Sequence, residues 1–244
     1  MISKVYFFLF VLISIQFCAT TQTTDSVRPE KEKSLDKTQL IDNLRLTYPP
    51  HQALTASFKL RGMQNGKKFF LTGKLNTGID KQHRIVSIKL YDAVFSSLVY
   101  SLDIDEVDVK TFDHMKRESQ TIALEEFYLV EIFGSYFPFK LLLPFLYGSV
   151  PEIIFFTNTK IDTKEGYIDF NGKSYHLRTR IVNNTVEELE YKDFYSGTIT
   201  HILFQGKLKN TNDYYFPKAI QVTNSQSEEY VSIEFTGVKF LENE

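Results

Sequence analysis

The chain has 244 residues and a formal net charge of −2 at pH 7, from 28 Lys and Arg against 30 Asp and Glu. This near-neutral balance provides neither the basic surface that nucleic acid requires nor a cation cluster that would hold an anionic membrane by charge alone. The 22 Phe and 14 Tyr carry more apolar surface than a bare sheet can hide from water, so we expect a sheet with a cover.

The first predicted element is a hydrophobic leader. Lys4 precedes residues 5–17, which are apolar apart from Ser14 and Gln16. This run is shorter than the roughly 20 residues that a membrane-spanning helix needs, but it matches the core of a secretory signal peptide. We therefore predict that residues 1–17 are a signal peptide.

The only cysteine, Cys18, follows this leader directly. The run Ile15-Gln16-Phe17-Cys18 resembles the lipobox of bacterial lipoproteins, in which the thiol receives diacylglycerol and becomes the new N-terminus. Ile15 fits the branched aliphatic position, whereas Phe17 departs from the small residue that usually precedes the cysteine. We expect Cys18 to be the lipid-attachment residue; the alternative is an ordinary cleaved signal peptide.

A polar segment separates this cysteine from the folded part. Residues 18–34 contain too little apolar surface to fold, so we predict a lipidated N-terminus followed by a flexible tether. The single folded domain is then expected at residues 35–244. Its first element is a predicted helix at 35–44, with Ser34 as N-cap and Pro49-Pro50 beyond its end.

From residue 54 the apolar residues recur with a period of two, which is typical of strands. The Asn65-Gly66 and Asn171-Gly172 pairs predict hairpin turns. We expect about eleven strands, in two groups. They are 54–61, 69–75, 86–90, 94–102 and 107–112, and then 167–170, 175–182, 186–194, 199–205, 216–223 and 230–240.

The middle of the chain has a different pattern. Residues 122–148 are dense in apolar side chains at helical spacing, with a break at Pro138 and an end at Gly148. We predict two helices, at 123–136 and 139–146. The fold class is thus mainly β (α+β): one long antiparallel sheet that curls because its strands twist, with helices over one face.

Apolar residues on both facing surfaces form either a packed core or a cavity for acyl chains. A packed core is the usual fate of any one such residue, and periodicity does not distinguish the two. The candidate cavity residues are Phe58, Leu60, Phe69, Leu71, Ile88, Phe139, Leu142, Leu143, Phe145, Leu146, Phe204 and Phe235.

Three stretches together resemble the LolA/LolB lipoprotein-carrier superfamily. They are residues 54–75, ending in Thr72-Gly73-Lys74-Leu75; residues 137–148, with Phe137-Pro138-Phe139-Lys140 and Leu146-Tyr147-Gly148; and residues 215–222 with the strand 231–235. The resemblance implies an unclosed barrel of about eleven strands whose helical lid covers the acyl chains of lipoproteins or other lipids. The lipoprotein leader favours a LolB-like member, anchored to the outer membrane at its periplasmic face.

The resemblance also implies partners and a membrane-insertion loop. The partners would be the acyl chains, the membrane reached through the N-terminal lipid, and a soluble LolA-like carrier. The loop between the third and fourth strands would place Val94 or Phe95 in the membrane; the alternative is that both residues begin a buried strand.

No catalytic pattern is evident. The five histidines lack ligand-like spacing, and the acidic cluster at 103–108 lacks the glycine and terminal glutamate of a calcium loop. We expect no enzyme, no cofactor and no metal. Two functions remain: a carrier or acceptor of lipoproteins or lipids, or an envelope interaction or stress-sensing lipoprotein with a filled core.

Overall fold

The computed structural model describes residues 37–48, 53–64, 66–80, 83–129, 137–155, 160–162, 166–208 and 214–241. The predicted signal peptide, Cys18, the tether and the N-cap Ser34 lie outside these residues. The elements below all belong to the compact unit Leu35–Glu244.

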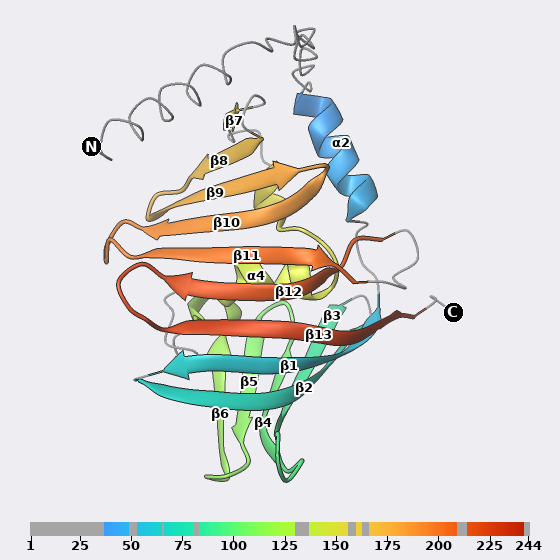
Figure 1. Ribbon diagram of the computed structural model, residues 1–244, viewed down its shortest axis with the longest axis vertical. Coiled ribbons are helices and arrows are strands. Elements are labelled where there is room, and N and C mark those ends of the chain that lie inside the picture. The colour runs from blue at the N-terminus through green and yellow to red at the C-terminus, as the bar shows by residue number, and fades with distance from the viewer. Residues whose placement is uncertain are drawn as a thin grey trace, which may run out of the picture. The chain divides into compact units, whose positions relative to one another are not determined.

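Within these described residues, thirteen strands form one antiparallel sheet in the order β6-β5-β4-β3-β2-β1-β13-β12-β11-β10-β9-β8-β7 (Figure 1). β1 and β13 pair in the middle, so the meander runs from β7 to β13 and continues through β1 to β6. The sheet ends at β6 and β7 and is open between them. The strands are β1 (Leu54–Gln64), β2 (Lys67–Asp80), β3 (His83–Asp92), β4 (Leu98–Ile104), β5 (Asp108–Asp113), β6 (Glu118–Ala123), β7 (Lys160–Asp162), β8 (Tyr167–Asn171), β9 (Tyr175–Val182), β10 (Thr185–Asp193), β11 (Ile199–Lys207), β12 (Pro217–Asn224) and β13 (Tyr230–Phe240).

Alternation along the strands sets which face is buried. In β1, Leu54, Ala56, Phe58 and Leu60 are buried, and the residues between them face outward. Gln64 pairs with Lys67, so a two-residue turn joins β1 to β2 as predicted, and Gly66 has the positive φ of 72° that such a turn requires.

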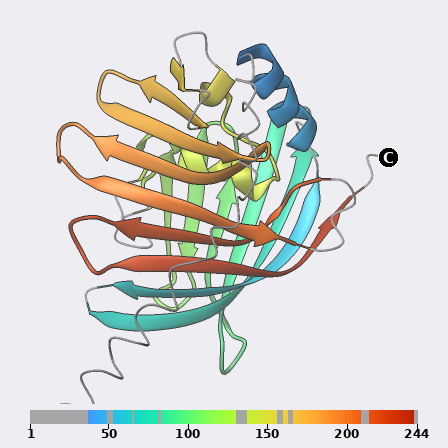
Figure 2. The same ribbon diagram turned by 45° about the horizontal axis from the view of Figure 1, so that its top comes forward.

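Helix α4 (Phe139–Leu146) lies on the concave face of the curved sheet, between the strands on either side (Figures 1 and 2). Its bounds match the prediction. Pro138 precedes it, and Gly148, with φ 75°, ends it. The predicted fold class, an unclosed antiparallel sheet with a helical lid over its concave face, is confirmed.

The predicted helix at 123–136 is wrong in its described part. Residues up to Ala123 belong to β6, and a 3-10 turn, η1 (Leu124–Glu126), follows. Phe127 is then extended, and Tyr128 forms an isolated antiparallel bridge with Pro138. The Leu129 N–H donates to the Phe137 carbonyl at 3.0 Å, and the Phe139 N–H donates to the Phe127 carbonyl at 3.0 Å. Pairing with residues 137–139 therefore sets the backbone here, and the buried Phe127 and Leu129 occur at a spacing that the sequence alone does not distinguish from a helix.

The strand count also differs from the prediction. β6 and β7, which were missed, are the two edge strands; β6 reads Glu-Ser-Gln-Thr-Ile-Ala and has no buried residue to produce an alternating pattern. The predicted fourth strand begins at Leu98 instead of residue 94, because residues 93–96 form the turn between β3 and β4. A second 3-10 turn, η2 (Glu152–Phe155), follows α4.

Helix α2 (Lys37–Thr47) ends later than the predicted residue 44 and packs through Leu40 and Leu44; residues 35 and 36, where the predicted helix starts, lie outside the described residues. Tyr48 follows it and is buried. The Val186 N–H of β10 donates to the Tyr48 hydroxyl at 3.0 Å, and burial raises the pKa of this phenol. This bond ties the end of α2 to a strand far away in the sequence and satisfies a buried backbone donor.

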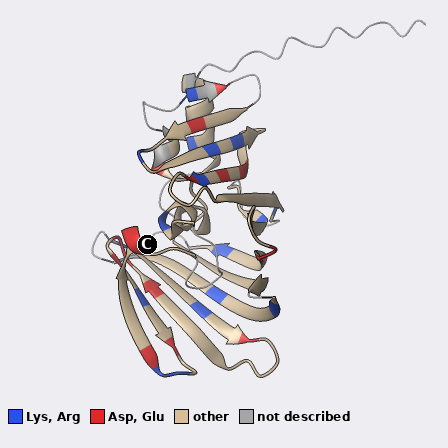
Figure 3. Cartoon of the chain, turned by 90° about the vertical axis from the view of Figure 1, so that its left-hand side faces the viewer, with Lys and Arg blue, Asp and Glu red and all other residues tan. Residues whose placement is uncertain are grey.

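Charged residues of both signs are interspersed along the described strands (Figure 3). Several face each other across neighbouring strands. Nε2 of His176 lies 2.9 Å from Oδ1 of Asp169, and Nδ1 of His201 lies 3.2 Å from Oε1 of Glu188. Two of the scattered histidines therefore belong to cross-strand pairs with carboxylates.

Two glycines leave room for aromatic rings on the neighbouring strand. Gly73 of β2 lies opposite Phe58 of β1, and Gly62 of β1 lies opposite Phe69 of β2. A Cβ atom at Gly73 would overlap the Phe58 ring, and one at Gly62 would overlap the Phe69 ring. Gly73 therefore allows Phe58 to lie against the sheet and point into the interior.

Gly73→Ala should lower the free energy of unfolding by about 1–3 kcal/mol, because the new methyl group displaces the buried Phe58 ring. Urea denaturation measures this loss. Gly78→Ala, on the same strand with open space at the Cβ position, is the matched control and should change stability by less than about 0.5 kcal/mol. Equal losses in the two variants would contradict this role of Gly73.

Candidate functional site

A small apolar cavity lies between α4 and the sheet. All of its lining residues are Phe, Leu or Ile, and they come from α4 and from five strands that follow one another in the sheet. The lining residues are Phe58, Leu60, Leu75, Ile88, Leu90, Leu102, Phe139, Leu142, Leu146, Ile233 and Phe235.

The volume of this cavity is about 40 Å³. Pockets that hold small ligands usually have roughly 300–1,000 Å³, so this space is far too small for an acyl chain. With no polar side chain in the lining, the cavity also offers no partner to a water molecule. In this conformation the interior between α4 and the sheet is almost filled.

Seven of the twelve predicted cavity residues line this space: Phe58, Leu60, Ile88, Phe139, Leu142, Leu146 and Phe235. The prediction omitted Leu75, Leu90, Leu102 and Ile233. Leu75 and Leu90 lie on the same period-two stripes as the residues that were chosen, so the inward face of each strand, taken whole, would have found them.

The other five predicted residues lie elsewhere. Phe145 packs on Phe204 of β11, with ring centroids 4.3 Å apart, and both are core residues. Phe69 and Leu71 are partly buried and pack against the core from β2. Leu143 faces a second space on the other side of α4.

That second space is an open cleft of about 720 Å³. Its lining combines three cationic and three anionic side chains with apolar ones. The lining residues are Arg45, Tyr48, Arg84, Asp105, Glu106, Leu124, Lys140, Leu143, Pro144, Tyr147, Ser149, Val150 and Glu152.

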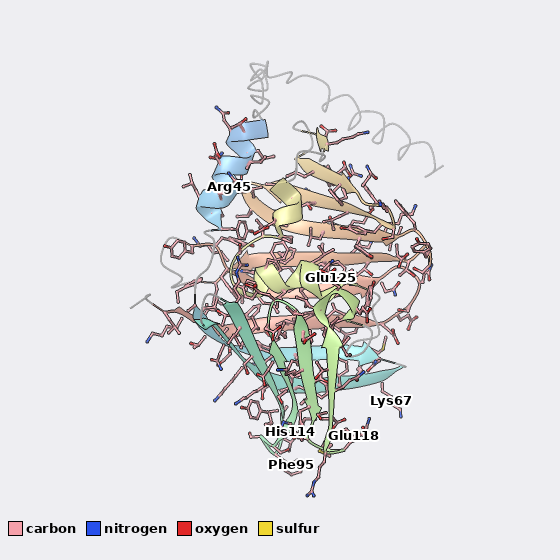
Figure 4. The ribbon with its side chains drawn as sticks, turned by 180° about the vertical axis from the view of Figure 1, so that it is seen from behind. Arg45, Lys67, Phe95, His114, Glu118 and Glu125 are labelled. Atoms are coloured by element: carbon pink, nitrogen blue, oxygen red, sulfur yellow. The ribbon has the colours of Figure 1, made fainter. Side chains whose placement is uncertain are left out.

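Interactions in and beside the cleft involve both signs of charge. Lys140 of α4 forms an ion pair with Glu125 of η1, which Figure 4 labels next to the helix. The Arg84 guanidinium lies 5.9 Å from the ring centroid of Tyr147, and the backbone N–H of Arg84 donates to Oε1 of Glu106 at 3.4 Å. Burial raises the pKa of the Tyr147 phenol.

Helix α4 separates the two spaces. Phe139, Leu142 and Leu146 line the cavity, whereas Leu143 and Tyr147 line the cleft. Pro144 stands inside this eight-residue helix and has no N–H to donate to the carbonyl four residues before it. A short helix with an incomplete set of backbone hydrogen bonds is thus the wall between an apolar interior and an open polar cleft.

The loop between β3 and β4 carries Val94 and Phe95, which are 79% and 83% exposed. Their N–H groups donate to Oδ1 of Asp92, at 2.9 and 2.7 Å. The alternative that these residues begin a buried strand is therefore wrong. The loop instead presents two large apolar side chains to its surroundings.

Within the described ranges, no three His, Cys, Asp or Glu side chains are grouped to hold a metal ion. Across the same residues, no helix has the length and apolar character needed to cross a bilayer.

The fold and its interior define an open antiparallel half-barrel with a helical lid over an apolar concave face. Among solved structures, a LolA superfamily protein from Nitrosomonas europaea matches with a TM-score of 0.56 and 9% identity, covering 86% of this chain and 96% of that one. A putative outer membrane lipoprotein-sorting protein domain from Vibrio parahaemolyticus matches with a TM-score of 0.52 and 10% identity, covering 82% and 90%. At these identities the similarity is one of fold. No family model and no curated protein sequence matches the chain.

Leu142→Ala should enlarge the cavity and lower the free energy of unfolding by about 2–5 kcal/mol. Benzene should then raise the Tm of the variant more than that of the unsubstituted protein, because an enlarged dry cavity binds apolar molecules. Lys140→Ala, on the outer side of the same helix, is the control and should cost less than about 1 kcal/mol. A Leu142→Ala variant of unchanged stability would show that the α4–sheet contact is already loose.

Proposed function

We propose that this protein is a carrier or acceptor of lipoproteins or other lipids, and that it holds their acyl chains between α4 and the concave face of the sheet. The observation that carries the proposal is the lining of this space by Phe, Leu and Ile alone. The shared fold with a LolA superfamily protein and with a lipoprotein-sorting domain supports it.

Acyl chains would enter as α4 moves away from the sheet. The 40 Å³ cavity would expand, and apolar contacts between α4 and the strands would be replaced by contacts with the chains. Burial contributes about 0.8 kcal/mol per methylene, so a chain of about fourteen methylenes would gain roughly 10 kcal/mol before ordering costs. The cleft beyond α4 would receive the polar part of the ligand, because its lining carries both signs of charge.

The same proposal includes the membrane. Cys18 would carry the lipid that anchors the domain to the outer membrane at its periplasmic face. Val94 and Phe95 would enter the bilayer, because both are exposed at the tip of one hairpin. A soluble LolA-like carrier would then deliver lipoproteins to the domain, which would assist their insertion at the membrane.

A second candidate is an envelope interaction or stress-sensing lipoprotein that carries no lipid. The small volume of the interior favours it, since a filled core needs no ligand. The two functions differ in whether α4 leaves the sheet to admit an acyl chain.

Leu102→Phe should abolish acyl-chain binding with little loss of stability. Leu102 lines the cavity from β4, and the larger ring would fill the space that a chain needs. Displacement of a fluorescent fatty acid by a diacyl lipid measures binding, and we expect at least a tenfold loss of affinity. Leu177→Phe in β9 is the control, because Leu177 is equally buried but away from the cavity. It should lower stability and keep binding. A protein that binds no fatty acid in any form, and copurifies with no lipid in a native mass spectrum, supports the second candidate.

Cys18→Ala should release the protein from membranes. The thiol would be the site of diacylglycerol attachment, so its loss removes the anchor. Detergent partitioning of both forms and mass spectrometry of the mature N-terminus measure the effect. A mature terminus beyond residue 18 that bears no lipid would contradict this part of the proposal.

A further inference from the structure

Among the described residues, three hairpin loops combine two aspartate bonds with a closing residue of positive φ; the β4–β5 loop at Asp105 has the bonds without the positive φ. In each of the three, an aspartate accepts two backbone N–H groups from the residues two and three positions later, and a residue with positive φ closes the loop. The aspartates are Asp92, Asp113 and Asp193, and the closing residues are Ser96, Arg117 and Gly197. The construction therefore holds the residue two positions after each aspartate away from the sheet.

That residue is a large exposed side chain in all three loops. Val94 in the β3–β4 loop is 79% exposed, Met115 in the β5–β6 loop 75% and Tyr195 in the β10–β11 loop 88%. In each loop the two bonds to the aspartate hold this side chain away from the sheet.

Two of the three loops lie side by side. β3, β4, β5 and β6 are consecutive antiparallel neighbours, so the β3–β4 and β5–β6 loops leave the sheet at the same end. Figure 4 shows Phe95, His114 and Glu118 together at this end. The His114 N–H donates to the Val99 carbonyl at 2.9 Å. This bond holds the β5–β6 loop against β4, the strand that follows the β3–β4 loop. The β10–β11 loop lies at a different side of the sheet (Figure 1).

Two basic side chains come directly after the exposed apolar residue of the β5–β6 loop. Lys116 and Arg117 come directly after Met115, and both are exposed. Oδ2 of Asp113 lies 3.7 Å from Nζ of Lys116, and the Lys116 N–H holds the pKa of this carboxyl below its usual range. The nearby acidic side chains are Asp92 and Asp113, which accept N–H groups of the loop backbone, and Glu118, the first residue of β6. Apolar tips with cations just behind them match the layers of a membrane surface, where lysine and arginine meet phosphates.

We propose that the β5–β6 loop is a second membrane contact beside the β3–β4 loop. Met115 enters the boundary between headgroups and acyl chains, and Lys116 and Arg117 bind lipid phosphates. The inference rests on the proposed membrane contact of Val94 and Phe95. With two contacts on neighbouring hairpins, the domain has a defined tilt on the bilayer, which a single point of attachment cannot give.

A bilayer fits this surface better than a protein does. Stable protein interfaces bury about 800 Å² on each partner, which requires a broad complementary surface. Two narrow tips offer little area to a rigid partner, but fluid lipid can surround them.

The test places an environment-sensitive NBD probe on an introduced cysteine at Phe95, Met115 or Tyr195 of the full chain, with Cys18→Ser so that one thiol remains. Vesicles contain equal parts of phosphatidylcholine and phosphatidylglycerol, with a spin label on the acyl chains as quencher. We expect probes on Phe95→Cys and Met115→Cys to brighten several-fold and to be quenched. The Tyr195→Cys probe, in the same loop geometry at another side, should not change.

The outcomes separate this inference from the proposed function. A response on Phe95→Cys alone overturns the second contact and leaves the first, whereas silence at both positions overturns both contacts. Acyl-chain binding in the interior is measured independently. A Met115→Cys probe that responds to protein concentration without vesicles would indicate a protein contact and overturn the inference.

Lys116→Gln with Arg117→Gln should weaken vesicle binding about fivefold or more, and unchanged binding would contradict the role of the cations.

Discussion

Pairing of β1 with β13 is the interaction on which the rest of the structure depends. It joins residues 54–63 to residues 230–240 in the middle of the sheet and makes one continuous meander out of two groups of strands. The inward side chains of this pair, Phe58, Leu60, Ile233 and Phe235, form part of the surface that α4 covers. Without the pair there would be two smaller sheets, and neither would enclose an apolar interior.

Local patterns were enough to predict most of the fold. Alternation in β1, the turn at Asn65-Gly66 and the proline and glycine around α4 each act within a few residues, so the sequence reveals them. β6 and the segment at 127–129 depend on hydrogen bonds to partners that sequence periodicity does not identify. Their residues therefore read as loop or as helix, although their backbone pairs with β5 and with residues 137–139.

The candidate site was predictable in composition but not in volume. Inward positions such as Ile88 and Leu142 were identified because apolar residues at these spacings face the interior. How closely they pack depends on side-chain volumes and on the path of α4, so the sequence left cavity and core undecided. For Val94 and Phe95, the useful local signal was Asp92, since an aspartate that binds the next backbone N–H groups favours a turn over a strand.

The central position of the β1–β13 pair has a consequence for how the chain folds. Leu54 pairs with Phe240, so the middle of the sheet joins residues near opposite ends of the domain, and closing so large a loop costs entropy before the contacts that reward it have formed. Each group of strands can form hairpins early, but the apolar face of each stays exposed until the two ends meet. This topology therefore favours slow folding, and the exposed apolar faces favour association between chains until the two groups of strands have joined.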